Sequence, residues 1–221
     1  GPFSAEHSGN SIGGVVLIET AIPQKREFHF DTSFFSQSFD GYGFDDTVRG
    51  QKSFFSYGDR FGNASVYLSY NHLDNDSQPQ TFFTGGPASD TISKVVSGAI
   101  PGVDSRDRAR LYFGDTGVVN TETDNLKLKL GYDSDGWSAL VNIAFEDRAS
   151  VADSPNSYVR DTGDDAVWSG NVTQDGKPFS MPASRLNIDE RDRESLSMGL
   201  RLKAKLKNRL SLEGNFSTFN V

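Results

Sequence analysis

A strict alternation of apolar and polar residues is the feature that most constrains this 221-residue chain. Between residues 195 and 206 every second residue is apolar, and the apolar set is Leu196, Met198, Leu200, Leu202, Ala204 and Leu206. A period of two is that of a β-strand with two different faces. The alternation resumes at residues 210–217 after Lys207-Asn208-Arg209, which predicts a hairpin. No segment has the periodicity of an amphipathic helix, so we expect an all-β fold.

The same hairpin pattern occurs twice more. Residues 126–132 and 137–145 alternate around the turn Asp133-Ser134-Asp135-Gly136, and residues 64–70 alternate after a turn at 59–63. Asp, Ser and Gly are typical residues of such tight turns. A strand from about Glu27 to Gln37 and a partner at roughly Val48 to Tyr57 precede them. The pattern therefore predicts about seven strands in an antiparallel up-and-down meander.

The lengths of the connections are asymmetric. Tight turns follow the even-numbered strands, whereas the two long connections, residues 74–120 and 147–190, follow odd-numbered ones. In a meander this places the short turns at one end and the long loops at the other, which is the layout of outer-membrane barrels. Strands of about 9 to 11 residues also suit a tilted bilayer crossing. A soluble sandwich shares the alternation, but it gives no reason for the asymmetry.

Composition excludes several classes of protein. The net charge is −8 with 22 Lys and Arg against 30 Asp and Glu, so no basic face for nucleic acid is expected. The absence of Cys excludes a disulfide framework, a thiolate zinc site and a cysteine nucleophile. The longest apolar run, Val15 to Ile18, is far shorter than the roughly 18 residues of a membrane-spanning helix. A membrane protein built from strands is compatible with these values.

The first twenty residues follow a different pattern. A Gly-Pro-Phe-Ser turn leads through a bend to Gly-Gly and a short apolar strand that ends in Thr; the motif residues are Gly1, Pro2, Ser4, Gly13, Gly14 and Thr20. This order resembles the closing motif of the plug domain in TonB-dependent outer-membrane receptors. The chain departs from that motif at His7-Ser8, with Gly9 displaced by one position, and at Leu17. The motif residues are therefore expected to have a structural role.

The resemblance implies an architecture. Residues 1–23 would be the C-terminal end of a plug domain, and residues 24–221 the first seven or so strands of a large transmembrane β-barrel of about 22 strands. The remaining plug and barrel, and the N-terminal segment that contacts the TonB energy-transducing complex, would lie outside this sequence, so a fragment is expected. The expected surroundings are outer-membrane lipid.

The same resemblance implies a function. Such receptors use energy from the TonB complex to import a scarce nutrient, most commonly a ferric siderophore or another iron chelate. No cofactor and no catalytic activity are expected. Two other classes stay open, namely a passive porin-like channel and a soluble or surface-anchored β-sheet binding protein. An enzymatic barrel is disfavoured because the sequence offers no paired acid, base and nucleophile.

Candidate ligand-binding residues are few. A basic cluster lies in the first long connection and consists of Arg106, Arg108 and Arg110. It would bind an acidic ligand or lipid phosphates, or it would balance the nearby acidic residues Asp104, Asp107 and Asp115. No Glu or His stands at metal-ligand spacing from any of the three His, so no metal site is expected.

Overall fold

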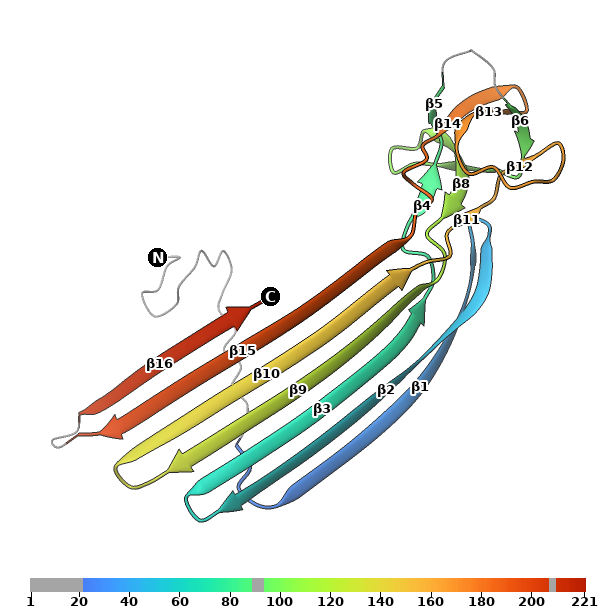
Figure 1. The fold of residues 1–221 in the computed structure, drawn as a ribbon. Helices are drawn as coiled ribbons and strands as arrows, with labels where there is room; N and C mark the ends of the chain where they lie inside the picture. Colours follow the sequence, from blue (N-terminus) through green and yellow to red (C-terminus); the bar gives the residue numbers. More distant parts are fainter. Residues whose placement is uncertain (1–21, 89–93, 207–209) are drawn as a thin grey trace.

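The computed structural model describes residues 22–88, 94–206 and 210–221, and in these ranges the chain is all-β without a helix. The plug motif from Gly1 to Thr20 and the expected turn at 207–209 lie outside the described residues. The expected all-β fold with antiparallel pairing is confirmed for the described part of the chain. Figure 1 shows one large curved sheet that carries a smaller body at one end.

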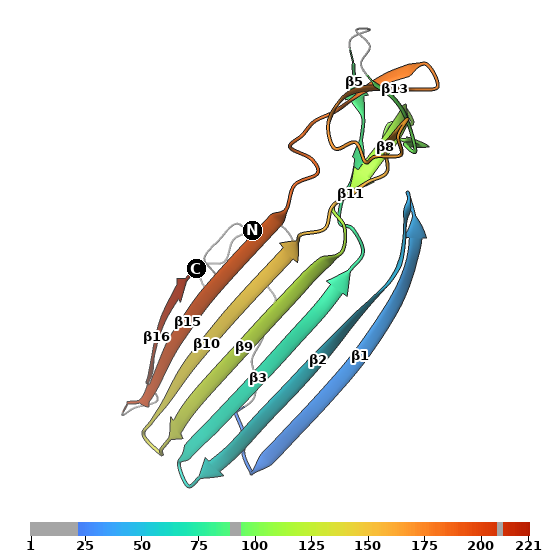
Figure 2. The ribbon, with the colours of Figure 1, turned by 45° about the vertical axis from the view of Figure 1, so that its right-hand side comes forward.

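The large sheet is a seven-stranded antiparallel meander with the spatial order β1-β2-β3-β9-β10-β15-β16, in which neighbouring strands are paired. Its strands are β1 (Glu27–Gly41), β2 (Phe44–Phe61), β3 (Ala64–Ser77), β9 (Val119–Asp133), β10 (Trp137–Ala152), β15 (Asp189–Lys205) and β16 (Ser211–Asn220). The strands lie side by side in all views (Figures 1 and 2). The sheet is open, with β1 and β16 as its edges.

Short and long connections segregate as expected. Residues 62–63, 134–136 and 206–210 join strands at one end, and residues 78–118 and 153–188 join them at the other. The β1–β2 turn is the exception, because it lies at the long-loop end yet has only two residues. Those residues, Tyr42 and Gly43, have φ of 53° and 88°, as expected for a two-residue hairpin turn.

Six of the seven strands are longer than the 9 to 11 residues expected, and β2 reaches 18 residues, whereas β16 has 10. Pairing continues past the alternating apolar segment into polar residues, as far as Ser77 opposite Val119 and Ala152 opposite Asp189. Backbone hydrogen bonds do not depend on side-chain polarity, so the apolar pattern alone could not reveal these extensions. Both long connections are correspondingly shorter than predicted.

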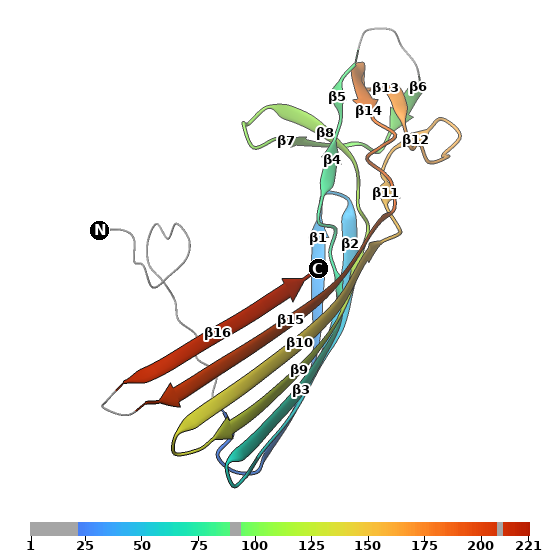
Figure 3. The same ribbon diagram turned by 60° about the vertical axis from the view of Figure 1, so that its left-hand side comes forward.

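The two long connections fold together into a small body, which we call the loop module (described residues of 78–118 and 153–188). Its strands are β4 (Phe82–Thr84), β5 (Gly86–Pro87), β6 (Lys94–Ser97), β7 (Ile100–Val103), β8 (Ala109–Asp115), β11 (Asn156–Ser157), β12 (Arg160–Asp161), β13 (Gly170–Gln174) and β14 (Lys177–Met181). They form two small sheets, β11-β8-β4 with β7 beside β8, and β12-β6-β13-β14-β5. Each sheet takes strands from both connections, so neither connection folds alone (Figure 3).

The loop module contains the hydrophobic core of the described chain. Its buried residues are Phe83, Val96, Ala99, Phe113, Val159, Val167, Val172, Phe179, Met181 and Leu186. Phe113 and Val159 are completely buried. The large sheet instead leaves most of its large apolar side chains exposed on one face. An apolar surface of this extent is unusual for a protein in water and marks a contact surface.

Candidate functional site

One face of the large sheet is a continuous apolar band. Residues directly opposite on neighbouring strands point to the same face, so the register groups them into rows. Three successive rows of the band are Phe30-Phe55-Tyr70-Leu126-Phe145-Leu196, Phe28-Tyr57-Leu68-Leu128-Ile143-Met198 and Asp59-Val66-Leu130-Val141-Leu200-Phe216. These side chains remain substantially exposed, with Phe28 at 65% and Leu130 at 45%. We call this side of the sheet the apolar face.

Asp59 is the exception in the band, and its charge is compensated locally. Its carboxylate is only 4% exposed and accepts hydrogen bonds from Arg26 Nε at 2.8 Å and from the Tyr57 hydroxyl at 2.9 Å. A buried carboxylate with a cationic and a hydroxyl partner avoids the cost of an unpaired charge. The band therefore contains no uncompensated charge along the three rows above.

The band ends abruptly at a single row. The next row toward the loop module is entirely polar and runs Thr32-Ser53-His72-Asp124-Asp147-Glu194. Tyr70, in the last apolar row, donates its hydroxyl hydrogen to Asp124 across this boundary. At the short-turn end, the rings of Tyr132 and Trp137 stack with centroids 4.8 Å apart. Aromatic residues with polar atoms thus stand at both limits of the band.

The opposite side, which we call the polar face, carries hydrophilic side chains at the same heights. Among them are Asn71, Asn125, Lys127, Lys129, Arg201 and Lys203. The chain before β1 crosses this face at the short-turn end. Arg60 donates to Gln24 Oε1 at 3.0 Å, and the Cγ atom of Pro23 lies 2.6 Å from the position that a Cβ would take on Gly58. Residues 22–24 therefore pack on the polar face rather than on the apolar one.

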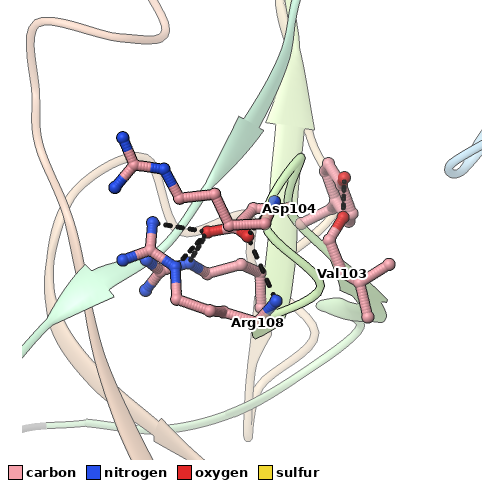
Figure 4. A network of polar contacts seen from close by, with 6 residues as sticks. Val103, Asp104 and Arg108 are labelled. Carbon is pink, nitrogen blue, oxygen red and sulfur yellow. Dashed lines mark hydrogen bonds and ion pairs between the residues drawn. The ribbon is translucent and has the colours of Figure 1, made fainter.

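Of the predicted basic cluster, Arg106 and Arg108 lie in the turn between β7 and β8, and Arg110 lies on β8. Asp104 Oδ1 accepts the backbone N–H groups of Arg106 and Arg108, and its Oδ2 accepts Nε of Arg108 at 2.8 Å and of Arg110 at 3.1 Å (Figure 4). These hydrogen bonds, that from the Arg108 side chain foremost, lower the pKa of Asp104 well below its ordinary value. The arrangement supports the interpretation in which acidic neighbours balance the cluster. Asp115 belongs to a different, buried network.

A hollow of about 400 Å³ adjoins this turn inside the loop module. Its charged lining residues are the cationic Arg110 and Lys177 and the anionic Asp175, and its apolar walls include Pro101, Leu111 and Phe179. Asp104 accepts the Nε–H of Arg110. Because a guanidinium has five N–H donors, four donors of Arg110 are not used by this hydrogen bond. Apolar walls with a few polar groups are typical of small-molecule sites. The hollow is suited to a small molecule with an apolar body and an acidic group.

Lys177 and Phe179 come from the second long connection, whereas Arg110 comes from the first. Neither Lys177 nor Phe179 was predicted from the sequence, because only the pairing of the two connections places them beside Arg110. A lysine beside proline in a polar loop carries no signal of a site. Arg106 and Arg108, which the sequence analysis grouped with Arg110, do not line this hollow.

A second hollow, of about 530 Å³, lies where the β1–β2 turn meets the loop module. Its lining is mostly polar and includes Asp45, Asp46, Asn156, Tyr158 and Arg160. The Tyr42 ring lies 5.0 Å from that of Phe82 and 4.9 Å from that of Tyr112, so the turn is docked on the module.

The fully buried carboxylate of Asp115 holds the base of the loop module. It accepts hydrogen bonds from the Gly117 N–H, from Asn156 Nδ2 at 3.0 Å and from the Tyr158 hydroxyl. Burial, and then the bond to Asp115, raises the pKa of Tyr158 far above its ordinary value, so it stays a neutral donor. Because Asp115 ends β8 just before β9, this network joins both connections at the end of the large sheet.

Comparison with known proteins gives no relative: no family model, no curated protein and no solved structure matches the chain. Among the described residues, no helix has the length and apolar character that a membrane crossing demands.

Proposed function

We propose that this chain is part of a TonB-dependent outer-membrane receptor that imports a scarce nutrient, an iron chelate being the first candidate. The observation that carries the proposal is the single-row change from an apolar to a polar surface across six strands. A soluble sheet would bury such a band against a second layer, but the described chain leaves it exposed. In the proposal, lipid covers the apolar face and the polar face lines the lumen.

The dimensions of the band support this assignment. On β10 the apolar positions run from Trp137 to Phe145, a segment of nine residues, which suits the roughly 9 to 11 residues of a tilted transmembrane strand. Tyr132 and Trp137 at one limit and Tyr70 at the other correspond to the two aromatic girdles of outer-membrane barrels. The polar continuations of the strands would then project outside the membrane and carry the loop module.

The open edges of the sheet also fit a part of a larger barrel. In lipid, unpaired N–H and C=O groups along β1 and β16 would be costly, so both edges require further strands. Residues 22–24 pack on the polar face at the short-turn end. In the proposal, a plug domain that precedes the barrel in the sequence would lie in the lumen, and a path over the polar face supports that arrangement.

The loop module supplies the proposed ligand-binding part. It lies at the end that would face the outside, it contains the hollow around Arg110, and it forms the larger polar hollow together with the β1–β2 turn. The cationic hollow around Arg110 and Lys177 favours an acidic chelate over a neutral one. A passive channel is the alternative, since a polar lumen face also occurs in porins.

Uptake of a labelled ferric siderophore tests the proposal in cells that produce the full protein, with and without functional TonB. Uptake that needs both the protein and TonB is the expected result. Equal uptake without TonB contradicts energy coupling, and single-channel conductance that stays open without TonB then identifies a passive channel. Extraction of the protein without detergent would contradict both membrane assignments.

A further inference from the structure

Three metal-ligating side chains converge on the apolar-face side of β3 and β9, just beyond the apolar band. They are His72 on β3 and Glu122 and Asp124 on β9, and one ligand atom of each lies within 4.8 Å of the others. His72 and Asp124 are direct cross-strand partners although they are 52 positions apart in sequence, and Nδ1 of His72 is 2.9 Å from Oδ1 of Asp124. This separation explains why sequence spacing predicted no metal site.

The charge around the group is unbalanced in a way that favours a cation. Asp74, two residues further along β3, and Asp147 on β10 lie on the same side of the sheet, and neither forms an ion pair within the described residues. On the polar face, by contrast, Glu146 is paired with Arg193. Apart from His72, the Glu122–Asp124 pair has no cationic partner among the described residues, although close carboxylates repel each other.

The hydrogen-bonded surroundings would hold the ligands in place. The Tyr70 hydroxyl donates to Oδ1 of Asp124, which leaves its Oδ2 for a metal ion. His72 Nδ1 also contacts this Oδ1, and rotation of the imidazole would exchange that contact for a bond to the ion. Partners of this kind orient metal ligands and tune their basicity. The His72 and Asp124 side chains are 25% and 38% exposed, so an ion has access from solvent.

We propose that His72, Glu122 and Asp124 bind one divalent transition-metal ion, with Zn²⁺ as the best chemical match. One imidazole and two carboxylates form a mixed nitrogen and oxygen set, and imidazole selects Zn²⁺ over Mg²⁺ and Ca²⁺. Tetrahedral Zn²⁺ with bonds of about 2.0 to 2.1 Å needs ligand atoms about 3.3 Å apart. Side-chain rotations that move the ligand atoms by about 1 Å would bring them to that spacing, and a water molecule would be the fourth ligand.

The bound ion would fasten β3 to β9 at the polar row. These strands lead into and out of the first long connection, which runs from residue 78 to residue 118. The ion would therefore stabilise the base of the loop module against fraying of the two polar strand extensions. The site needs only the observed β3–β9 register, so it does not rest on the proposed transport function.

Zn²⁺ titration of the purified full protein in detergent, after removal of metal with EDTA, tests the site by calorimetry. We expect one Zn²⁺ per chain, with affinity weakened more than about tenfold by either His72→Ala or Glu122→Gln. His29→Ala, on the polar face of β1, removes an imidazole away from the site and serves as the matched control that retains binding. Co²⁺ gives a second measurement, since its visible absorption reports the loss of the imidazole in His72→Ala.

Two results would overturn the site. One is the absence of stoichiometric Zn²⁺ binding by the wild-type protein, and the other is binding that both His72→Ala and Glu122→Gln leave unchanged. Glu122→Gln keeps the size of an exposed side chain, so it separates loss of a ligand from loss of the fold. Circular dichroism of each variant confirms that the strands are intact.

Discussion

Tyr70 on β3 and Asp124 on β9 join the last apolar row of the large sheet to the first polar row through a hydrogen bond from the tyrosine hydroxyl. The ring of Tyr70 stays in the apolar band while its hydroxyl reaches the carboxylate. Tyr and Trp behave in this way where one end of the side chain is in an apolar environment and the other in a polar one. The pair therefore marks the level at which this face of the sheet changes from apolar to polar.

Tyr70→Phe removes this hydrogen bond without changing the size of the ring. We expect the free energy of unfolding to fall by about 1 kcal/mol, because one hydrogen bond to a partly exposed carboxylate is lost. Tyr132→Phe is the matched control, since the ring of Tyr132 stacks on Trp137 and keeps that contact. Urea unfolding of the reconstituted protein measures both. An equal effect of the two substitutions would mean that the hydroxyl of Tyr70 has no special role.

Arginine scanning of β16 tests which face meets lipid. Phe216 and Ser217 are neighbours on this strand, and the register puts Phe216 in a row with Leu200 and Ser217 opposite Gly199. Phe216→Arg is expected to lower the free energy of unfolding in lipid by roughly 2 to 4 kcal/mol, the cost of Arg near the centre of a bilayer. Ser217→Arg is expected to have little effect, because the polar face would line an aqueous lumen.

If both arginine variants unfold alike in lipid vesicles, or if Ser217→Arg is the more damaging, the apolar face does not contact lipid. Measurement in detergent and in vesicles of two thicknesses strengthens the comparison, because the cost of a charge depends on its depth in the bilayer.

The large sheet was predictable from the sequence because its information is local. Alternation from Leu196 to Leu206 and the turn at residues 133–136 define strands and turns within a few residues. The polar extensions of β3 and β9 were not predictable, since side chains such as Asp74 and Glu122 give no strand signal and only backbone pairing orders them. Where a strand continues beyond the apolar band, its sequence no longer alternates, but its backbone hydrogen bonds to the neighbouring strand continue.

The loop module and its sites could not be predicted for a different physical reason. β6 pairs with β13 in parallel, and β8 pairs with β11, so each small sheet depends on contacts between the two long connections. Such contacts leave no periodic pattern in either connection. The basic cluster was recognised as a group, yet the single Asp104 that organises it was one of three acidic candidates.

Asp104→Asn tests the role of this carboxylate and its pH dependence. Because the pKa of Asp104 is lowered from 3.8 in the folded protein, its ionised form stabilises the β7–β8 turn. This contribution is complete above pH 3.8 and declines as the pH falls below that value toward the lowered pKa. At pH 7 the variant should exchange the backbone amide hydrogens of residues 102–111 faster than the wild type does.

The β13–β14 hairpin provides an internal reference for that measurement, since it lies in the same module and has no bond to Asp104. After correction for intrinsic exchange, the difference between wild type and variant should stay constant from pH 5 to about pH 4 and should shrink as the pH falls below 3.8. A difference between them that does not shrink on acidification would show that the carboxylate charge is not what holds the turn.

Lys177→Glu tests whether the cationic hollow of the loop module binds the acidic part of a ligand. The substitution reverses one of the two cationic side chains that line the hollow, while the Phe179 wall stays in place. Binding of an anionic ferric catecholate should weaken by more than about tenfold, which corresponds to one lost charge-assisted contact of about 1.4 kcal/mol or more. A neutral ferric hydroxamate should be nearly unaffected. Fluorescence quenching of the purified protein gives both affinities.

Arg185→Glu is the control for that experiment, because it makes the same change in net charge in the same module but lines neither hollow. Long-range attraction is screened within about 8 Å at physiological ionic strength, so a general field effect would act on both variants similarly. A loss confined to Lys177→Glu assigns the contact to the hollow. Equal losses in the two variants would mean that Lys177 acts only through the overall charge of the module. Unchanged binding in both variants would contradict binding in this hollow and would make the larger polar hollow beside the β1–β2 turn the next candidate.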